Sequence, residues 1–157
     1  MRRAAPLLVA ALTVLASCRT PTSAPAIAPE KIELFAEAPD GGREWMLPQS
    51  GVHVRTDEMP VVTAGDITRV QVVDLDLGPA LNLDLTPAGA AAIGQRAAGA
   101  DHRFLLVSDG HPMGVARVQR QAAASRISLF VEMPDAELAA WSRAIATRLR
   151  RAQGERE

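Results

Sequence analysis

Residues 81–131 read LNLDLTPAGAAAIGQRAAGADHRFLLVSDGHPMGVARVQRQAAASRISLFV, and most of the signals that decide the fold lie in this stretch. The first five residues alternate leucine with Asn82 and Asp84, which is the period-two pattern of a strand with one buried face. Thr86 then offers a hydroxyl N-cap, and Pro87 occupies the first helical position, where its missing N–H is not needed. The stretch therefore predicts a strand that leads directly into a helix.

The same stretch predicts that helix and three further strands. The helix over residues 87–98 is rich in alanine, with Ile93 as its only large apolar side chain, so that it can lie close to a sheet. Asp109-Gly110 is a strong signal for a two-residue hairpin turn. The three strands are expected at residues 103–108, 113–118 and 126–132.

Shorter strand-like segments precede this stretch. Residues 31–38 alternate, which predicts a strand with two different faces. The apolar face is formed by Ile32, Leu34 and Ala36, and the opposite face by Glu33, Phe35 and Glu37. Further strands are expected at residues 44–47, 52–54 and 70–75. Thr63 is expected to cap a single helical turn over residues 63–67, and the strand after it should pair with residues 81–85.

The C-terminal region predicts a second helix, over residues 135–151. Its apolar side chains recur at a helical spacing and form one stripe, at Leu138, Trp141, Ile145 and Leu149. The arginines of its last turn suit the helix dipole and indicate a solvated C-terminus, with a membrane-surface role as the alternative. Together these elements predict an α+β fold, a small and mostly antiparallel sheet with two helices packed on it.

The first 18 residues have the features of a bacterial lipoprotein leader. Two arginines at residues 2–3 form a positive n-region, and residues 4–16 form an apolar h-region that is too short to span a bilayer. Residues 15–18 read LASC, which resembles the lipobox, whose cysteine becomes lipidated and N-terminal. Cys18 is the only cysteine of the chain. We expect an exported protein anchored in the envelope through acylated Cys18; an ordinary secretory leader is the alternative.

Composition, together with the positions of turn-forming residues, predicts the order of segments along the chain. The chain has 157 residues, of which 48% are apolar, and this is enough for one domain of ordinary size. A net charge of −1 with 3% aromatic residues and no basic patch argues against nucleic-acid binding. The expected segments are a leader at 1–17, a Pro/Ala/Ser/Thr tether at 18–30, an N-terminal β section at 31–62, an α+β domain at 63–151 and a polar tail at 152–157.

The residues with reactive side chains do not form a recognisable catalytic or metal-binding pattern. His102 and His111 would be about 20 Å apart on the predicted hairpin, at about 3.3 Å per residue, and His53 has no partner at a ligand spacing. Ser108 and Asp109 are adjacent in sequence, which is not the geometry of a triad, and Asp109 is better explained as a turn former. We therefore expect no catalytic residue, no metal and no cofactor.

Three segments, in order, resemble the head subdomain of the large periplasmic loop of SecD, a protein-export membrane protein. They are LTPAGAAAI, FLLVSDG and RISLFVEMPDAELA, within residues 81–139, and VVTAGDI before them is a weaker match. The sequence departs from the family at residues 114–116, where a small-small-proline run is usual and Gly-Val-Ala stands here. No transmembrane bundle is evident, so the ion-coupled pulling step of SecD is not expected in this chain alone.

The resemblance implies a SecD-head-like domain on a lipid anchor that binds protein, either an export substrate or a translocase component. In SecD the corresponding region is thought to contact translocating polypeptide, and an exposed strand edge can accept an extended peptide. The alternative is a module on the same fold that binds a small molecule or an envelope polymer, because fold alone does not determine function.

Overall fold

The structure, a computed structural model, describes residues 31–40, 42–98, 102–118 and 125–154. The predicted leader, the tether and Cys18 lie outside these ranges. The strands are β1 (Ile32–Ala36), β2 (Arg43–Met46), β3 (His53–Thr56), β4 (Val62–Thr63), β5 (Ile67–Leu75), β6 (Gly78–Leu85), β7 (His102–Ser108), β8 (His111–Val118) and β9 (Arg126–Val131). The helices are the 3-10 turn η1 (Ala64–Asp66), α1 (Pro87–Ala97) and α2 (Asp135–Gly154). In this part of the chain, no helix has the length and hydropathy needed to cross a bilayer.

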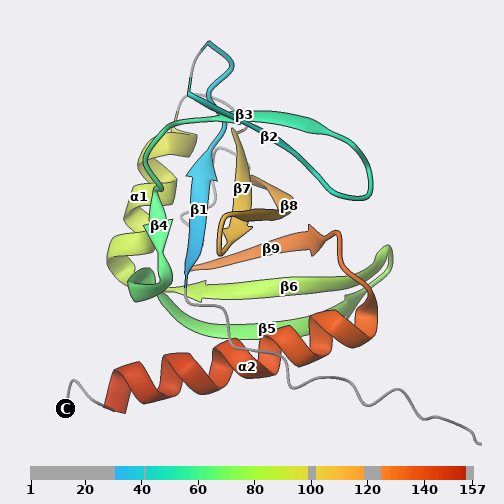
Figure 1. Cartoon of the computed structure of the whole chain (residues 1–157). Coiled ribbons are helices and arrows are strands. Elements are labelled where there is room, and N and C mark those ends of the chain that lie inside the picture. The colour runs from blue at the N-terminus through green and yellow to red at the C-terminus, as the bar shows by residue number, and fades with distance from the viewer. Residues whose placement is uncertain (1–30, 41, 99–101, 119–124, 155–157) are drawn as a thin grey trace, which may run out of the picture.

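Seven strands form one antiparallel sheet in the order β4-β1-β7-β8-β9-β6-β5, and β2 and β3 form a separate hairpin. The α+β class expected from the sequence is therefore confirmed. β8 and β9 are joined by two residue pairs, Gly114 with Val131 and Val115 with Phe130. At this short junction the sheet bends, so that β1, β7 and β8 run steeply across β9, β6 and β5 (Figure 1). We call β4-β1-β7-β8 the four-stranded half and β9-β6-β5 the three-stranded half.

Local sequence signals predicted several elements correctly. The Thr86 hydroxyl accepts a hydrogen bond from the Gly89 N–H at 3.1 Å, and α1 begins at Pro87. Asp109 and Gly110 both have positive φ, 48° and 81°, as a tight two-residue hairpin turn requires. η1 follows Thr63 as expected. The last helix continues beyond the predicted end at residue 151, to Gly154.

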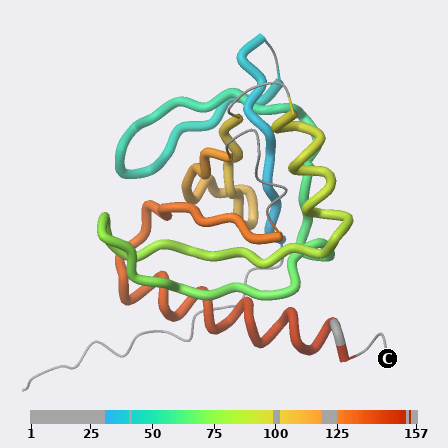
Figure 2. Tube along the Cα trace, turned by 180° about the vertical axis from the view of Figure 1, so that it is seen from behind, coloured from blue at the N-terminus to red at the C-terminus, as the bar shows by residue number. Residues whose placement is uncertain are grey.

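The main hydrophobic core lies between the two halves of the sheet and is closed by both helices. α2 lies along β5, and α1 lies beside β4 (Figures 1 and 2). The predicted stripe of α2 is buried in this core, together with Ile93 of α1. Trp141 of the stripe also donates its indole N–H to the Ser108 hydroxyl at 3.3 Å, which ties α2 to the end of β7.

A second, smaller core lies on the other face of the four-stranded half, beneath the β2–β3 hairpin. It contains Phe35, Trp45, Leu47, Val54, Leu105 and Val107. The predicted division of β1 into two faces agrees with the structure, since Ile32, Leu34 and Ala36 lie in the main core and Phe35 lies in the second one. The second face is also buried, with exposed fractions of 4% for Phe35 and 8% for Glu33. Because the hairpin covers this face, β1 is buried on both sides, a pattern that alternation alone does not predict.

β1 and β4 belong to the same sheet as the later strands. β1 pairs with β4 on one side and with β7 on the other. The boundary expected between residues 62 and 63 consequently falls inside β4. Residues 31–63 and the elements after them share the main core, because Ile32, Leu34 and Val62 are members of it.

Candidate peptide-binding edge and groove

β5 is one outer edge of the sheet and the longest strand of the described residues. Its nine residues pair with β6, and it ends the strand order. The sequence predicted a strand at 70–75; β5 begins earlier, at Ile67, because η1 ends at Asp66 and Ile67 is buried in the main core. The register shifts between Ile67 and Arg69. An outer strand presents backbone N–H and C=O groups that can pair with another chain.

A groove runs between the first part of β5 and the C-terminal part of α2. Its volume is about 360 Å³, and its walls are Thr68, Arg69, Val70 and Gln71 on β5 and Ala146, Leu149 and Arg150 on α2. A second hollow, of about 370 Å³, shares Thr68 and Leu149 with it and continues toward η1. The buried side chains of Val70 and Leu149 make part of the lining apolar. Both hollows lie along the start of β5.

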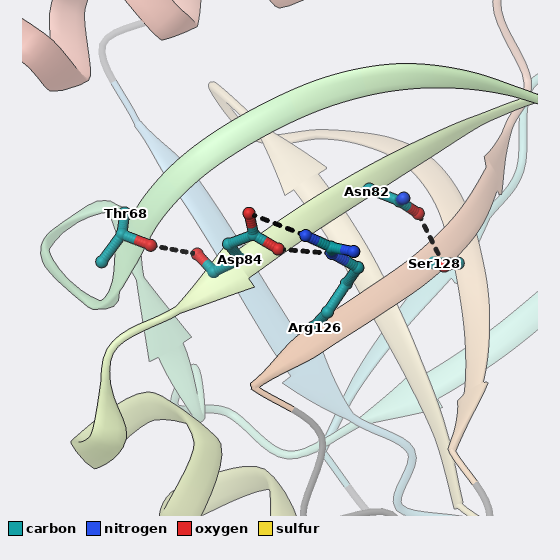
Figure 3. A network of polar contacts seen from close by, with 5 residues as sticks. All are labelled: Thr68, Asn82, Asp84, Arg126 and Ser128. Carbon is teal, nitrogen blue, oxygen red and sulfur yellow. Dashed lines mark hydrogen bonds and ion pairs between the residues drawn. The ribbon is translucent and has the colours of Figure 1, made fainter.

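The solvent-facing side of the three-stranded half carries rows of polar side chains that cross its strands. Arg126 of β9 donates to both carboxylate oxygens of Asp84 on β6, at 2.5 and 3.3 Å. In the next row the Ser128 hydroxyl donates to the Asn82 amide oxygen at 2.6 Å. Thr68 of β5 reaches the Asp84 carbonyl oxygen at 3.1 Å (Figure 3). These contacts bridge the three strands, and the Thr68 contact adds to the pairing of β5 with β6.

Asp84 and Arg126 of this network stabilise each other's charged form. The hydrogen bond from Arg126 lowers the pKa of Asp84, and burial opposes this lowering, while the charges of Arg126 and Arg69 add to it. Conversely, the hydrogen bond to Asp84 raises the pKa of Arg126. Asp84 is therefore ionised at neutral pH, and Arg126 is its direct partner.

A carboxylate holds the β2–β3 hairpin to the end of β9. Glu132 accepts hydrogen bonds from the backbone N–H groups of Gln49 and Ser50, at 2.8 and 3.0 Å. Burial raises the pKa of Glu132, but hydrogen bonds from Ser50 and Gln49 outweigh it, so that this pKa lies below its usual value. These two hydrogen bonds link residues that are separated by 83 and 82 positions in the sequence. They keep the hairpin over the second core.

Ser108 and Asp109, whose residue types also occur in hydrolase active sites, make structural contacts near the β7–β8 turn. Ser108 is 5% exposed and accepts from Trp141. Asp109 accepts from the Lys31 backbone N–H at 2.7 Å, and its own N–H donates to the Lys31 carbonyl at 2.9 Å. His102 and His111 lie at opposite ends of the hairpin. Over the described ranges, no three histidine, cysteine or acidic residues are placed to hold a metal ion.

Sequence reasoning expected a strand edge but did not locate the groove. The arginines at the end of α2 are exposed, as a solvated terminus predicts, and Arg150 also lines the groove. No local signal relates residues 68–71 to residues 146–150, because the two segments meet only through packing of α2 on β5. The signal that could have helped to locate the groove is the apolar stripe of α2, because it determines which side of that helix faces the sheet.

This arrangement of one bent antiparallel sheet, two helices and a covering hairpin defines a SecD-like fold. No protein-family model matches the chain, and no curated protein matches it by sequence. Among solved structures it is similar to SecDF in a super-membrane-facing form, with a TM-score of 0.57 and 14% identity over 74% of this chain and 18% of that chain. It is also similar to SecDF described as a membrane component that enhances protein export, with a TM-score of 0.55 and 15% identity over 78% of this chain and 63% of that one.

These likenesses confirm the SecD-like fold expected from the sequence. The chain spans less than two thirds of the length of either SecDF chain. At 14–15% identity, similarity of fold does not extend to activity or partners.

Proposed function

We propose that this protein is a non-catalytic lipoprotein of the bacterial envelope whose SecD-like domain binds extended polypeptide at the edge of β5. The observation that carries the proposal is the long outer strand β5 with a groove directly beside it. Backbone groups at such an edge bind a peptide without regard to its sequence, and pockets beside the edge accept its side chains. One of the two similar SecDF proteins is described as enhancing protein export, which makes exported chains or translocase components the candidate partners.

The proposal includes an anchor at Cys18. Acyl chains contribute about 0.8 kcal/mol per buried CH₂, so that several chains on one cysteine hold a protein stably at a membrane, where one chain is marginal. We expect Cys18→Ala to release the protein from the membrane fraction and to abolish incorporation of labelled fatty acid. A variant that still fractionates with membranes and still incorporates label would contradict an anchor at this residue.

Photo-crosslinking in living cells tests the binding role directly. A photo-reactive amino acid at Gln71, in the wall of the groove, should capture polypeptide, whereas the same group at Arg143, an exposed position of α2 that does not line the groove, should not. Mass spectrometry then identifies what is captured. Equal capture at both positions, or none at Gln71 with the protein correctly anchored, would refute peptide binding at this edge.

The competing function is binding of a small molecule or an envelope polymer in the same groove. A volume of about 360 Å³ lies within the range of small-ligand sites, roughly 300–1,000 Å³. A purified wild-type protein that carries a bound non-peptide ligand, detected by native mass spectrometry and lost on filling the groove with Ala146→Trp, would favour this alternative.

A further inference from the structure

The groove beside β5 has a charged rim over an apolar lining, and both features are provided by residues far apart in the sequence. Arg69 stands on the β5 side and Arg150 on the α2 side, while Val70 and Leu149 line the groove between them. The two arginines are exposed, and the two apolar side chains are buried. A ligand that combines an apolar group with negative charge would match this lining.

Within the described residues, neither arginine of the rim forms an ion pair with a carboxylate at 4 Å or less, although the charge of Arg69 acts on Asp84 from a longer distance. The ion pairs there join Lys31, His53, Arg55, Arg96, Arg103 and Arg126 to acidic side chains. Arg150 makes one long contact, at 3.4 Å, with the Thr147 hydroxyl. With its amide oxygen facing Arg69, Gln71 accepts from that guanidinium at 3.3 and 2.7 Å, which orients Arg69 without neutralising it.

Among the described residues, no acidic one lines the two hollows, and the carboxylates of Asp84 and Asp66 accept hydrogen bonds from residues other than the rim arginines. Asp84 is opposite Arg69 in the strand register, but its two carboxylate oxygens accept from Arg126. Asp66 accepts from the backbone and side chain of Thr63, at 3.0 and 2.9 Å. The rim therefore keeps an excess of positive charge, and a guanidinium presents two parallel N–H groups that match a carboxylate.

We propose that the groove selects extended polypeptide segments in which an acidic side chain neighbours an apolar one, with the carboxylate bound by Arg69 and Arg150. This inference rests on the proposed function and names the chemistry of the peptide. The α2 wall from Ala146 to Ala152 is about 9 Å long at 1.5 Å per residue. At about 3.3 Å per residue, that length accommodates about three residues of an extended chain, enough for one acidic side chain and an apolar neighbour.

Three blocked peptides test the selection. Each is acetylated and amidated, carries an uncharged dye and has the core Val-X-Val-X-Val, where X is Glu, Gln or Lys. Blocking the ends leaves the two Glu side chains as the only carboxylates of the Glu peptide, and the Gln and Lys peptides have none. Binding to the full chain in a neutral detergent is measured by fluorescence anisotropy, with empty micelles as the blank. We expect the Glu peptide to bind most tightly, the Lys peptide least, and the preference to shrink as salt is added.

Two substitutions connect this preference with the rim. Arg69→Gln and Arg150→Gln should each weaken binding of the Glu peptide about threefold, and the double variant about tenfold, with little change for the Gln peptide. Arg143→Gln removes the same charge from an exposed position of α2 outside the groove and should leave all three affinities unchanged. Circular dichroism of each variant checks that it is folded.

The outcomes separate the two proposals. Equal binding of the three peptides, or an equal effect of Arg143→Gln and the rim substitutions, overturns the selection for acidic segments while peptide binding stands. Binding of none of the peptides overturns both. A preference for the Glu peptide that the double variant abolishes supports the groove as an acid-selective peptide site.

Discussion

The two halves of the sheet differ in how they are covered. The four-stranded half has the main core on one face and the β2–β3 hairpin on the other, so that β1 is buried along its whole length. The three-stranded half has the core on one face and water on the other, and β9 alternates between buried and exposed residues. The difference indicates that the first half holds the fold together, whereas the second half offers an open face and, at β5, an outer strand with the groove between it and α2.

The same difference decides which substitutions the protein should tolerate. On β1 and most of β7, which are covered on both faces, the side chains are buried and truncation leaves a cavity. On the open half, water can replace the hydrogen bonds that are lost when an outward-facing side chain is truncated. Four substitutions test this contrast.

The largest loss is expected for Trp45→Ala, which removes the centre of the second core. Trp45 is 6% exposed, packs against Phe35 with a ring-centroid distance of 5.7 Å and donates to the buried Thr56 hydroxyl at 2.9 Å. Its truncation should lower the free energy of unfolding by about 3–5 kcal/mol. Urea unfolding followed by circular dichroism measures this. Met46→Ala, at the neighbouring exposed position, should cost less than about 0.5 kcal/mol. Equal effects would show that the hairpin is not a structural cover.

The junction of the two halves should be the next most sensitive place. A Cβ on Gly114 would lie 2.1 Å from the Phe130 carbonyl oxygen, so that β8 and β9 could not keep their pairing. Gly114→Ala should therefore lower the free energy of unfolding by about 1–3 kcal/mol. A matched control is Gly94→Ala in α1, where the added methyl meets no atom within 4 Å and should stabilise the protein by about 0.5–1 kcal/mol. If Gly114→Ala and Gly94→Ala change the free energy of unfolding alike, the close approach of β8 and β9 is not the cause of the change.

A smaller, pH-dependent effect is expected at Glu132, which holds the hairpin to β9. Because its pKa is lower in the folded protein, its stabilisation is complete above the ordinary glutamate pKa of 4.5 and is lost as the pH falls through the folded-state pKa. Glu132→Gln should lower the free energy of unfolding by about 1 kcal/mol at pH 7 and by less at pH 3. Urea unfolding at both pH values measures the difference. A penalty that does not change with pH would contradict a charge-dependent contact.

The smallest effect is expected on the open face of the three-stranded half. Ser128→Ala removes the 2.6 Å hydrogen bond to Asn82, but water can reach both positions, and the loss should stay below about 0.5 kcal/mol. Its counterpart on the covered side is Thr56→Val, which leaves the buried Trp45 indole N–H without its acceptor and should cost about 1–3 kcal/mol. Similar losses in the same urea experiment would mean that the two halves are not differently covered.

Local patterns predicted strands in both halves of the sheet but not the second cover of the four-stranded half. The alternation at residues 81–85 correctly placed Leu81, Leu83 and Leu85 in the core, because one face of β6 meets solvent. Alternation also separated Phe35 from the main-core face of β1, but it could not show that the β2–β3 hairpin covers Phe35, since that cover is a tertiary contact. The groove was missed for the same reason: Arg69 and Arg150 become neighbours only when α2 packs along β5. Period and capping are local properties, whereas the second cover and the groove depend on long-range packing.

The narrow β8–β9 junction also has a mechanical consequence. In the proposed function, a tether would pull on residue 31 and so on β1, and a polypeptide bound at β5 would pull on the outer strand of the other half. Five residue pairs join β1 to β7, but only two join β8 to β9, with one further backbone hydrogen bond from Glu132 to Met113. Under such tension we expect the step from β8 to β9 to yield first.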